Sequence, residues 1–175
     1  MALINYRSGT TNYSYTSENL MASAGGYGVA DDPLDRFHFA AISPNYQPWM
    51  QYDGNDLIEE RGDSGVLRRY VHGPGTDEPI VWYEGASLAD RRWLHADERG
   101  SVVAVSDSAG SAIAINRYDE YGIPAATNIG RFQDAGQTWL PEIGMYYYKA
   151  RIYSPHPRPV HADRSHRLCR RNVLL

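Results

Sequence analysis

Three histidines and a cysteine near the C-terminus are residue types that bind metals. His156, His161, His166 and Cys169 form the series H-x4-H-x4-H-x2-C. Imidazole and thiolate groups are the ligands that zinc prefers, and four of them can complete a tetrahedron. The series lacks paired, short-spaced ligands, and the sequence around it has no fold-like pattern that would hold them. We therefore predict no metal site here, and no cofactor.

The same segment is strongly basic. Residues 156–175 contain five arginines and one aspartate, so the first 155 residues carry a net charge of −8 in a chain of net charge −4. Guanidinium groups bind phosphates through charge-assisted, bidentate hydrogen bonds. No aromatic residue accompanies these arginines for base stacking. We predict no specific nucleic-acid partner. We also expect the tail to be disordered, because it has too few large apolar residues to offset the cost of ordering.

A third motif resembles two unrelated kinds of site. Gly62-Asp63-Ser64-Gly65 is similar to the nucleophile loop of trypsin-like proteases, and with Arg61 it contains the Arg-Gly-Asp of integrin ligands. A serine nucleophile needs a base and an orienting acid brought to it in space. No matching histidine segment is visible, and the motif lies where a hairpin turn is expected. We interpret it as a turn.

The segment "WLHADERG" contains possible general acid and base groups. His95 alternates with Trp93, which places both on one face of a strand, and Asp97 and Glu98 open the turn that follows. A structural turn is the favoured interpretation. The sequence therefore predicts no catalytic residue in this segment.

Tyrosines cluster before the basic tail. We expect one strand from Met145 to Tyr153, with Tyr146 and Tyr148 on one face and Tyr147 on the other. Packing is the favoured role of these rings. Aromatic faces that are exposed on a sheet can also stack on sugars, so a carbohydrate-binding platform stays open as an alternative.

The elements that must position these groups are strands. The chain holds 14 Tyr and 16 Gly, a composition typical of strands and turns. Runs of period two are separated by Asp-Gly and Asp-Ser-Gly clusters, which are hairpin signals because Gly, Asp and Asn tolerate positive φ. No segment holds a 3.6-residue stripe over three turns. An all-β fold is predicted, with turns at Ser17-Glu18-Asn19, Asp53-Gly54-Asn55, Gly62-Asp63-Ser64-Gly65, Asp97–Gly100 and Asp107–Gly110.

A repeat underlies the hairpins. Arg68-Arg69-Tyr70, Arg91-Arg92-Trp93 and Asn116-Arg117-Tyr118 follow one another at spacings of 23 and 25 residues. Such a period, with one hairpin in each unit, predicts an open, twisted antiparallel strip rather than a closed sandwich. Asp53 and Asp119 each follow a tyrosine, and we expect both to accept hydrogen bonds from turn amides.

These residues resemble the Rhs/YD-repeat family of bacterial proteins. "YDGNDLIEERGDSGVLRRYVHGPGTDEPIVWYEG" is similar to the last YD repeats, and "WLHADERGSVVAVSDSAGSAIAINRYDEYGIP" to the segment leading into the Rhs-associated core. "GRFQDAGQTWLPEIGMYYYKARIYSP" resembles the core signature, which commonly reads G-R-F-x-Y-T-G-Q and then Y-Y-x-x-R-x-Y. The resemblance covers about Leu20 to Pro155. It divides the chain into a degenerate repeat region (1–51), YD repeats (52–128), the start of the core (129–155) and the tail (156–175).

The resemblance implies a structural role. In the family, YD repeats build a hollow β-shell around a C-terminal toxic domain, and the core plugs one end. In many members the core also cuts the chain, using aspartates near a D-P-x-G stretch and the arginine of a preceding G-R-F. The implied partners are the protein's own upstream repeats and its toxin cargo, in bacterial toxicity.

The sequence departs from the family in three places. Asp134-Ala135 replaces the usual Tyr-Thr, and Asp35 stands where the repeat usually turns on glycine. After "YSP" the second G-R-F and the D-P-x-G are absent. The tail "HPRPVHADRSHRLCRR" can, however, be back-translated so that a shift of one nucleotide reads "TLGRFMQTDPIGYADG". We therefore predict a frameshift after Pro155.

The sequence as a whole predicts a structural fragment of a toxin-encapsulating shell. Without the Asp-Pro pair and the second Gly-Arg-Phe we expect no enzymatic activity, and Asp163 is given no role although it lies near the aspartate of the shifted frame. A carbohydrate- or surface-binding module and an autoproteolytic core in an intact frame are the alternatives. The fragment is expected to self-associate through unpaired sheet edges. Neither a signal peptide nor a membrane span is apparent, and the location is left open.

Overall fold

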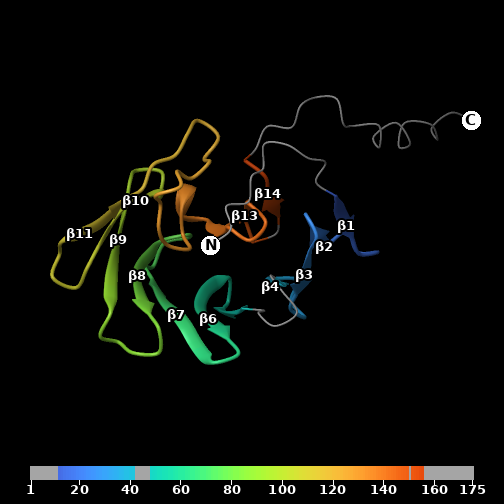
Figure 1. Cartoon of the computed structure of the whole chain (residues 1–175), viewed down its shortest axis with the longest axis horizontal. Coiled ribbons are helices and arrows are strands. Elements are labelled where there is room, and N and C mark those ends of the chain that lie inside the picture. Colours follow the sequence, from blue (N-terminus) through green and yellow to red (C-terminus); the bar gives the residue numbers. More distant parts are fainter. Residues whose placement is uncertain (1–11, 42–47, 150, 156–175) are drawn as a thin grey trace, which may run out of the picture.

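The computed structural model describes residues 12–41, 48–149 and 151–155, and it confirms the all-β prediction. Eleven strands pair antiparallel, each with the next in sequence, into one open sheet, which we call the strip (Figure 1). Three further strands form a small second sheet. Within the described residues, no helix is long and apolar enough to cross a membrane.

The strands are short, and tight turns join most of them. The strip contains β1 (Tyr13–Tyr15), β2 (Met21–Ala24), β3 (Tyr27–Asp31), β4 (Phe37–Ala41), β5 (Trp49–Asp53), β6 (Asp56–Gly62), β7 (Gly65–His72), β8 (Pro79–Glu84), β9 (Arg91–Ala96), β10 (Val102–Ser106) and β11 (Ala112–Ile115). The small sheet contains β12 (Thr138–Leu140), β13 (Met145–Tyr147) and β14 (Ile152–Tyr153), preceded by the 3-10 turn η1 (Asp134–Gly136).

Aspartates fix several turns of the chain, as the sequence predicts for Asp119, which lies in a turn after β11. Its Oδ1 accepts hydrogen bonds from the backbone N–H groups of Tyr121 (2.9 Å) and Ile123 (2.8 Å). The same arrangement recurs at Asp32, Asp97 and Asp107. Such bonds satisfy two backbone N–H groups of each turn. Asp53 differs from this prediction, because it lies within β5 opposite Asp56 of β6.

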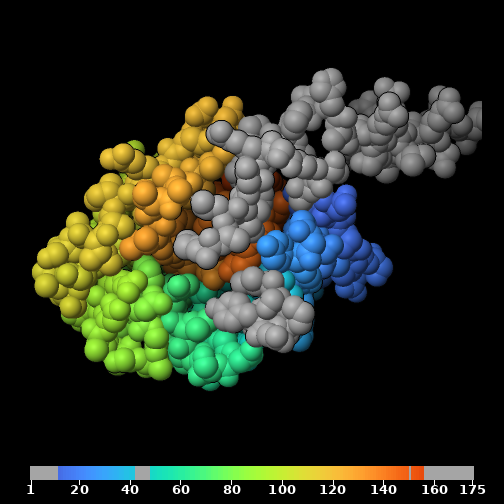
Figure 2. All heavy atoms as spheres, viewed as in Figure 1, coloured from blue at the N-terminus to red at the C-terminus, as the bar shows by residue number. Residues whose placement is uncertain are grey.

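The core lies between the concave face of the strip and the chain that follows it. The strip curves from β1 to β11 around the segment that contains β12, β13 and β14 (Figures 1 and 2). We call residues 129–149 and 151–155 the plug. Its buried apolar residues form one cluster with those of the strip: Phe132, Leu140, Ile143, Met145 and Tyr147 from the plug, and Ala24, Val29, Phe37, Ala40, Met50, Leu57, Tyr70, Trp82, Leu94, Val102 and Val105 from the strip.

The prediction of one strand from Met145 to Tyr153 is wrong. The structure ends β13 at Tyr147 and begins β14 at Ile152. Between them, Lys149 takes a left-handed conformation (φ 59°), and the N–H of Tyr148 donates to the carbonyl of Arg151 (2.7 Å). The chain therefore reverses here, and β14 pairs antiparallel with β13.

The backbone of the turn η1 packs closely against the loop of Asp77 in the strip. Gly136 has a φ of 69°, and a Cβ at this position would collide with the carbonyl oxygen of Asp77. Ala135 beside it also has a positive φ, of 52°. At Gly136, glycine is favoured for two reasons: it adopts a positive φ readily, and it has no Cβ to collide with the neighbouring backbone.

Replacing Gly136 by alanine is expected to destabilise the chain by about 1–3 kcal/mol more than a matched change at Gly110. Gly110 also has a positive φ, of 87°, but a Cβ there would meet nothing within 4 Å. Both variants therefore carry the left-handed backbone penalty, and only the change at Gly136 adds a steric collision. Urea unfolding of the two variants measures the difference. Equal losses would mean that the close approach to Asp77 does not limit the packing of η1.

Candidate functional site: the seat of the plug on the strip

The chemical groups named first in the sequence cannot be placed relative to one another. His156, His161, His166 and Cys169 lie outside the described residues, as do the tail arginines and Asp163. Within the described residues, no group of three or more His, Cys, Asp or Glu side chains could hold a metal ion.

The two remaining motifs lie in hairpins. Gly62 pairs with Gly65, so the protease-like motif is a tight turn between β6 and β7. His95 stands on β9, and its Nε2 lies 2.8 Å from the Oγ of Ser106 on β10. Asp97 accepts backbone hydrogen bonds in the next turn. These side chains therefore occupy strand and turn positions, and the contacts described for them are those of a hairpin.

The tyrosines divide into a buried and an exposed group. Tyr146 and Tyr147 are buried on the two faces of β13, and the hydroxyl of Tyr146 donates to the carbonyl of Gly122 (2.7 Å). Tyr148 and Tyr153 are exposed, with their rings edge to face at 5.9 Å. Packing is thus the role of the buried pair.

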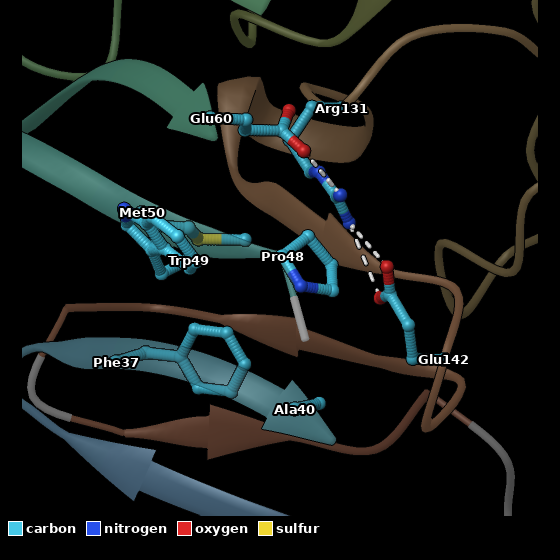
Figure 3. Close-up of a pocket in the computed structure, with 8 residues that line it drawn as sticks. All are labelled: Phe37, Ala40, Pro48, Trp49, Met50, Glu60, Arg131 and Glu142. Carbon is cyan, nitrogen blue, oxygen red and sulfur yellow. Dashed lines mark hydrogen bonds and ion pairs between the residues drawn. The ribbon is translucent and has the colours of Figure 1, made fainter. Parts of the chain in front are cut away.

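The polar centre of the molecule is Arg131, in the plug's Gly-Arg-Phe sequence. The side chain is only 5 % exposed and lies between two carboxylates (Figure 3). Its Nη2 donates to the Oε2 of Glu60 on β6 (2.5 Å), and its Nη1 lies 3.2 Å from both carboxylate oxygens of Glu142. Nη1 also donates to the carbonyl of Trp139 (3.2 Å). Arg131 therefore links the strip to two parts of the plug.

Glu60 is the buried acceptor of this arrangement. Its side chain is 1 % exposed, and its Oε1 accepts a hydrogen bond from the hydroxyl of Tyr70 on β7. Burial opposes ionisation of the carboxyl. The charges of Arg131 and Arg68 and the hydrogen bonds outweigh it, and they lower the pKa of Glu60 to about 2. Burial and the neighbouring carboxylate raise the pKa of Tyr70. Glu60 is thus held as an anion and Tyr70 as a neutral donor.

The charges continue across the strip. Glu60, Arg68 and Glu84 stand directly opposite one another on β6, β7 and β8. Arg68 lies 3.6 Å from Glu60 and 3.3 Å from Glu84. Arg92 on β9 lies 3.4 Å from Glu84 and 4.3 Å from the centre of the Trp82 ring. Opposite charges on adjacent strands favour this register. We call Glu142, Arg131, Glu60, Arg68, Glu84 and Arg92 the charge ladder.

A second set of contacts anchors the plug on the strip's loops. Asp77 lies in the loop between β7 and β8. Its carboxylate forms an ion pair with the Nζ of Lys149 (2.8 Å) and accepts a hydrogen bond from the side-chain amide of Gln137 (2.8 Å). Ser101, before β10, donates through its hydroxyl to Asp134 (3.1 Å) and accepts from the N–H of Ala135 (2.9 Å). Asp134 and Ala135 thus contact the loop before β10 directly.

The space around Arg131 is filled. The hollow beside its ion pairs has no volume for a water molecule, and its apolar wall is formed by Phe37, Ala40, Pro48, Trp49 and Met50 (Figure 3). A second hollow of about 20 Å³ lies between the plug and the loop of Asp77, enough for about one water molecule. The site is therefore shaped to hold the plug itself.

The charge of Glu60 makes the stability of the chain sensitive to acid. Its folded pKa of about 2 lies below the ordinary 4.5, so its contribution is complete above pH 4.5 and is lost as the pH falls towards 2. The loss is on the order of 3 kcal/mol. Urea unfolding over this range should show a steeper loss for the native chain than for Glu60→Gln. Equal pH dependence of the two proteins would contradict the assignment.

The charge ladder could not be predicted from the sequence. Glu60 and Arg131 are 71 residues apart, and neither stands in a motif that predicts the other. A bulge in β6 at Ile58 shifts the inward-facing positions from Leu57 to Glu60, which breaks the simple alternation. The one signal was the placement of Glu60, Arg68 and Glu84 in consecutive predicted strands, where their opposite charges favour pairing.

Comparison with curated proteins finds partial relatives, and no protein-family model matches the chain. The tRNA3(Ser)-specific nuclease WapA of Bacillus spizizenii is 32 % identical over 113 residues, which is 59 % of this chain and 5 % of that protein. The tRNA nuclease WapA of Bacillus subtilis strain 168 is 31 % identical over the same length. The chain thus matches a small part of much longer proteins.

Two solved structures have a similar fold over most of this chain, and one of them is a holotoxin pore. The crystal structure of TcdB2-TccC3-Cdc42 matches with a TM-score of 0.56 and 18 % identity, over 83 % of this chain and 8 % of that one. The Photorhabdus luminescens Tc holotoxin pore matches with a TM-score of 0.57 and 16 % identity, over 86 % of this chain and 9 % of that one. The open antiparallel strip and its plug are therefore a fold that this chain shares with a segment of those assemblies.

Proposed function

We propose that this chain is the wall and plug segment of an Rhs/YD-repeat shell that encloses a toxin. The observation that carries the proposal is the seat of the plug: a buried arginine ties the plug to the concave face of an open sheet. The similarity to parts of the WapA nucleases and the fold shared with the TccC3 complexes support it. The role is structural, since the site is filled by the plug itself.

In an intact parent, the partners would be the upstream repeats and the cargo. The test uses the protein expressed from the gene after its reading frame has been restored downstream of the Pro155 codon. We expect this protein to protect the polypeptide that follows the core from added protease. Arg131→Ala should remove that protection, and Arg99→Ala, at an arginine that is 67 % exposed, should preserve it. Rapid digestion of the cargo in all three proteins would contradict an enclosing role.

The chain itself is proposed to have no self-cleaving activity. The family's cleavage uses an Asp-Pro pair and a second Gly-Arg-Phe, and the sequence after Pro155 contains neither. Intact mass spectrometry of the purified chain during prolonged incubation should give the uncut mass throughout. A fragment cut near the C-terminus would show that other residues perform the cleavage.

The tail is proposed to be translated out of frame. The support is the single shift that converts residues 156–171 into a run resembling the family's Gly-Arg-Phe and Asp-Pro segment. The coding DNA around the Pro155 codon tests it. The proposal fails if no change of one base restores that frame.

A second candidate function is carbohydrate binding, which the exposed tyrosines favour. Tyr121, Tyr148 and Tyr153 are each at least 36 % exposed, and the hydroxyl of Tyr153 donates to the carbonyl of Tyr121 (3.3 Å). Such rings can stack on sugars. A glycan array would support this function if binding is lost in Tyr148→Ala and Tyr153→Ala. An array without binding would rule it out for the glycans tested.

A further inference from the structure

The last strand of the strip has an open edge of unusual composition. Within the described part of the chain, β11 pairs with β10 and ends the sheet. Its residues are Ala112, Ile113, Ala114 and Ile115, with the two isoleucines 45 % and 56 % exposed. Natural sheets usually protect a free edge with lysine, proline or a covering element. Here neither a charge nor a proline interrupts the strand.

The backbone of this edge is available for pairing. The N–H of Asn116 donates to the carbonyl of Val103 on β10 (2.9 Å). Because backbone groups alternate in direction along a strand, the neighbouring Ile115 directs its N–H and C=O away from β10. An added antiparallel strand would satisfy these groups and would cover the isoleucines.

The three residues Ile113, Ala114 and Ile115 at the centre of this edge read the same in both directions. If β11 pairs antiparallel with the β11 of a second copy about Ala114, each Ile113 meets the Ile115 of the other copy. Cross-strand pairs of β-branched residues stabilise a sheet. The same register brings Arg117 opposite Ser111 of the second copy, beside its Asp107–Gly110 turn, where the charges of Arg117 and Asp107 are complementary.

We propose that β11 is a twofold interface through which two copies of this chain join their strips into one continuous sheet. The pairing continues the antiparallel ladder of β10 and β11. Because a twofold axis through Ala114 uses the same edge of both copies, the assembly stops at a dimer. The inference concerns this chain by itself, and it stands whether or not the chain functions as part of a shell.

The mass of the chain in solution tests the interface. Sedimentation velocity over a wide range of concentration is expected to show a reversible species of twice the 19.7 kDa chain mass. The double variant Ile113→Lys with Ile115→Lys should be monomeric, because lysines would face each other across the axis. The matched control is Ile58→Lys with Val71→Lys, which adds the same charge at apolar residues of similar exposure (38 % and 48 %) on interior strands. This control should still form dimers.

A disulfide trap tests the register independently of those variants. With the single cysteine removed by Cys169→Ser, Ala114→Cys should give a covalent dimer on oxidation, since residues facing each other across an antiparallel pair lie within disulfide range. Ser14→Cys on β1 is the control and should give none. A monomeric native chain, a series of species larger than a dimer, or equal crosslinking at both positions would each overturn the proposal.

Discussion

Replacing Arg131 by alanine is expected to lower the free energy of unfolding by about 3–5 kcal/mol. The change leaves Glu60 buried at 1 % exposure without its closest partner, and it also breaks the contacts to Glu142 and to the carbonyl of Trp139. An unpaired buried charge costs far more than an intact pair contributes. Urea unfolding followed by tryptophan fluorescence measures the loss.

Arg99→Ala is the matched control for this prediction. Arg99 also lies near carboxylates, at 3.6 Å from Asp134 and 3.9 Å from Asp97, but its side chain is 67 % exposed. Ion pairs in such surroundings contribute at most about 1 kcal/mol. If Arg131→Ala costs no more than Arg99→Ala, the charge ladder does not hold the plug.

Replacing Phe132 by alanine should cost about 3–5 kcal/mol. The ring is 4 % exposed and packs edge to face on Tyr70 (4.9 Å) and His72 (5.2 Å) of β7. Its loss would leave a cavity between the plug and the strip, because the surrounding strands are held in register by their own hydrogen bonds. Hydrogen exchange should show faster opening of β12 and β13 together with the loss of stability.

Tyr15→Ala provides the comparison for Phe132. Tyr15 is an aromatic residue of similar size on β1, but it is 56 % exposed. A surface change of this kind usually alters stability by no more than about 0.5 kcal/mol. Similar losses for the two variants would mean that the plug contributes little to the core.

The strip could be predicted from the sequence because its information is local. The predicted turns carry their own signals, such as Asp107–Gly110, where an aspartate side chain accepts two backbone hydrogen bonds and a glycine takes a positive φ. Strands that pair with their neighbours in sequence need little beyond those turns. The all-β class and the antiparallel order follow from the same signals.

The seat of the plug could not be predicted in the same way. The ion pair between Glu60 and Arg131 joins residues far apart in sequence, and spacing along the chain does not encode it. The break at Lys149 could not be predicted because alternating tyrosines favour a continuous strand, whereas the ion pair of Lys149 with Asp77 is compatible with a reversal. Tertiary contacts override local propensity at these points.

Arg131 holds the plug to the strip through Glu60. A double-mutant cycle with Glu60→Gln, Arg131→Met and the combined variant measures this directly. We expect a coupling energy of at least about 1.5 kcal/mol. The combined variant should therefore lose less stability than the sum of the losses of the two single variants. Losses that add within about 0.5 kcal/mol would show that the two side chains act independently, and would contradict the claim.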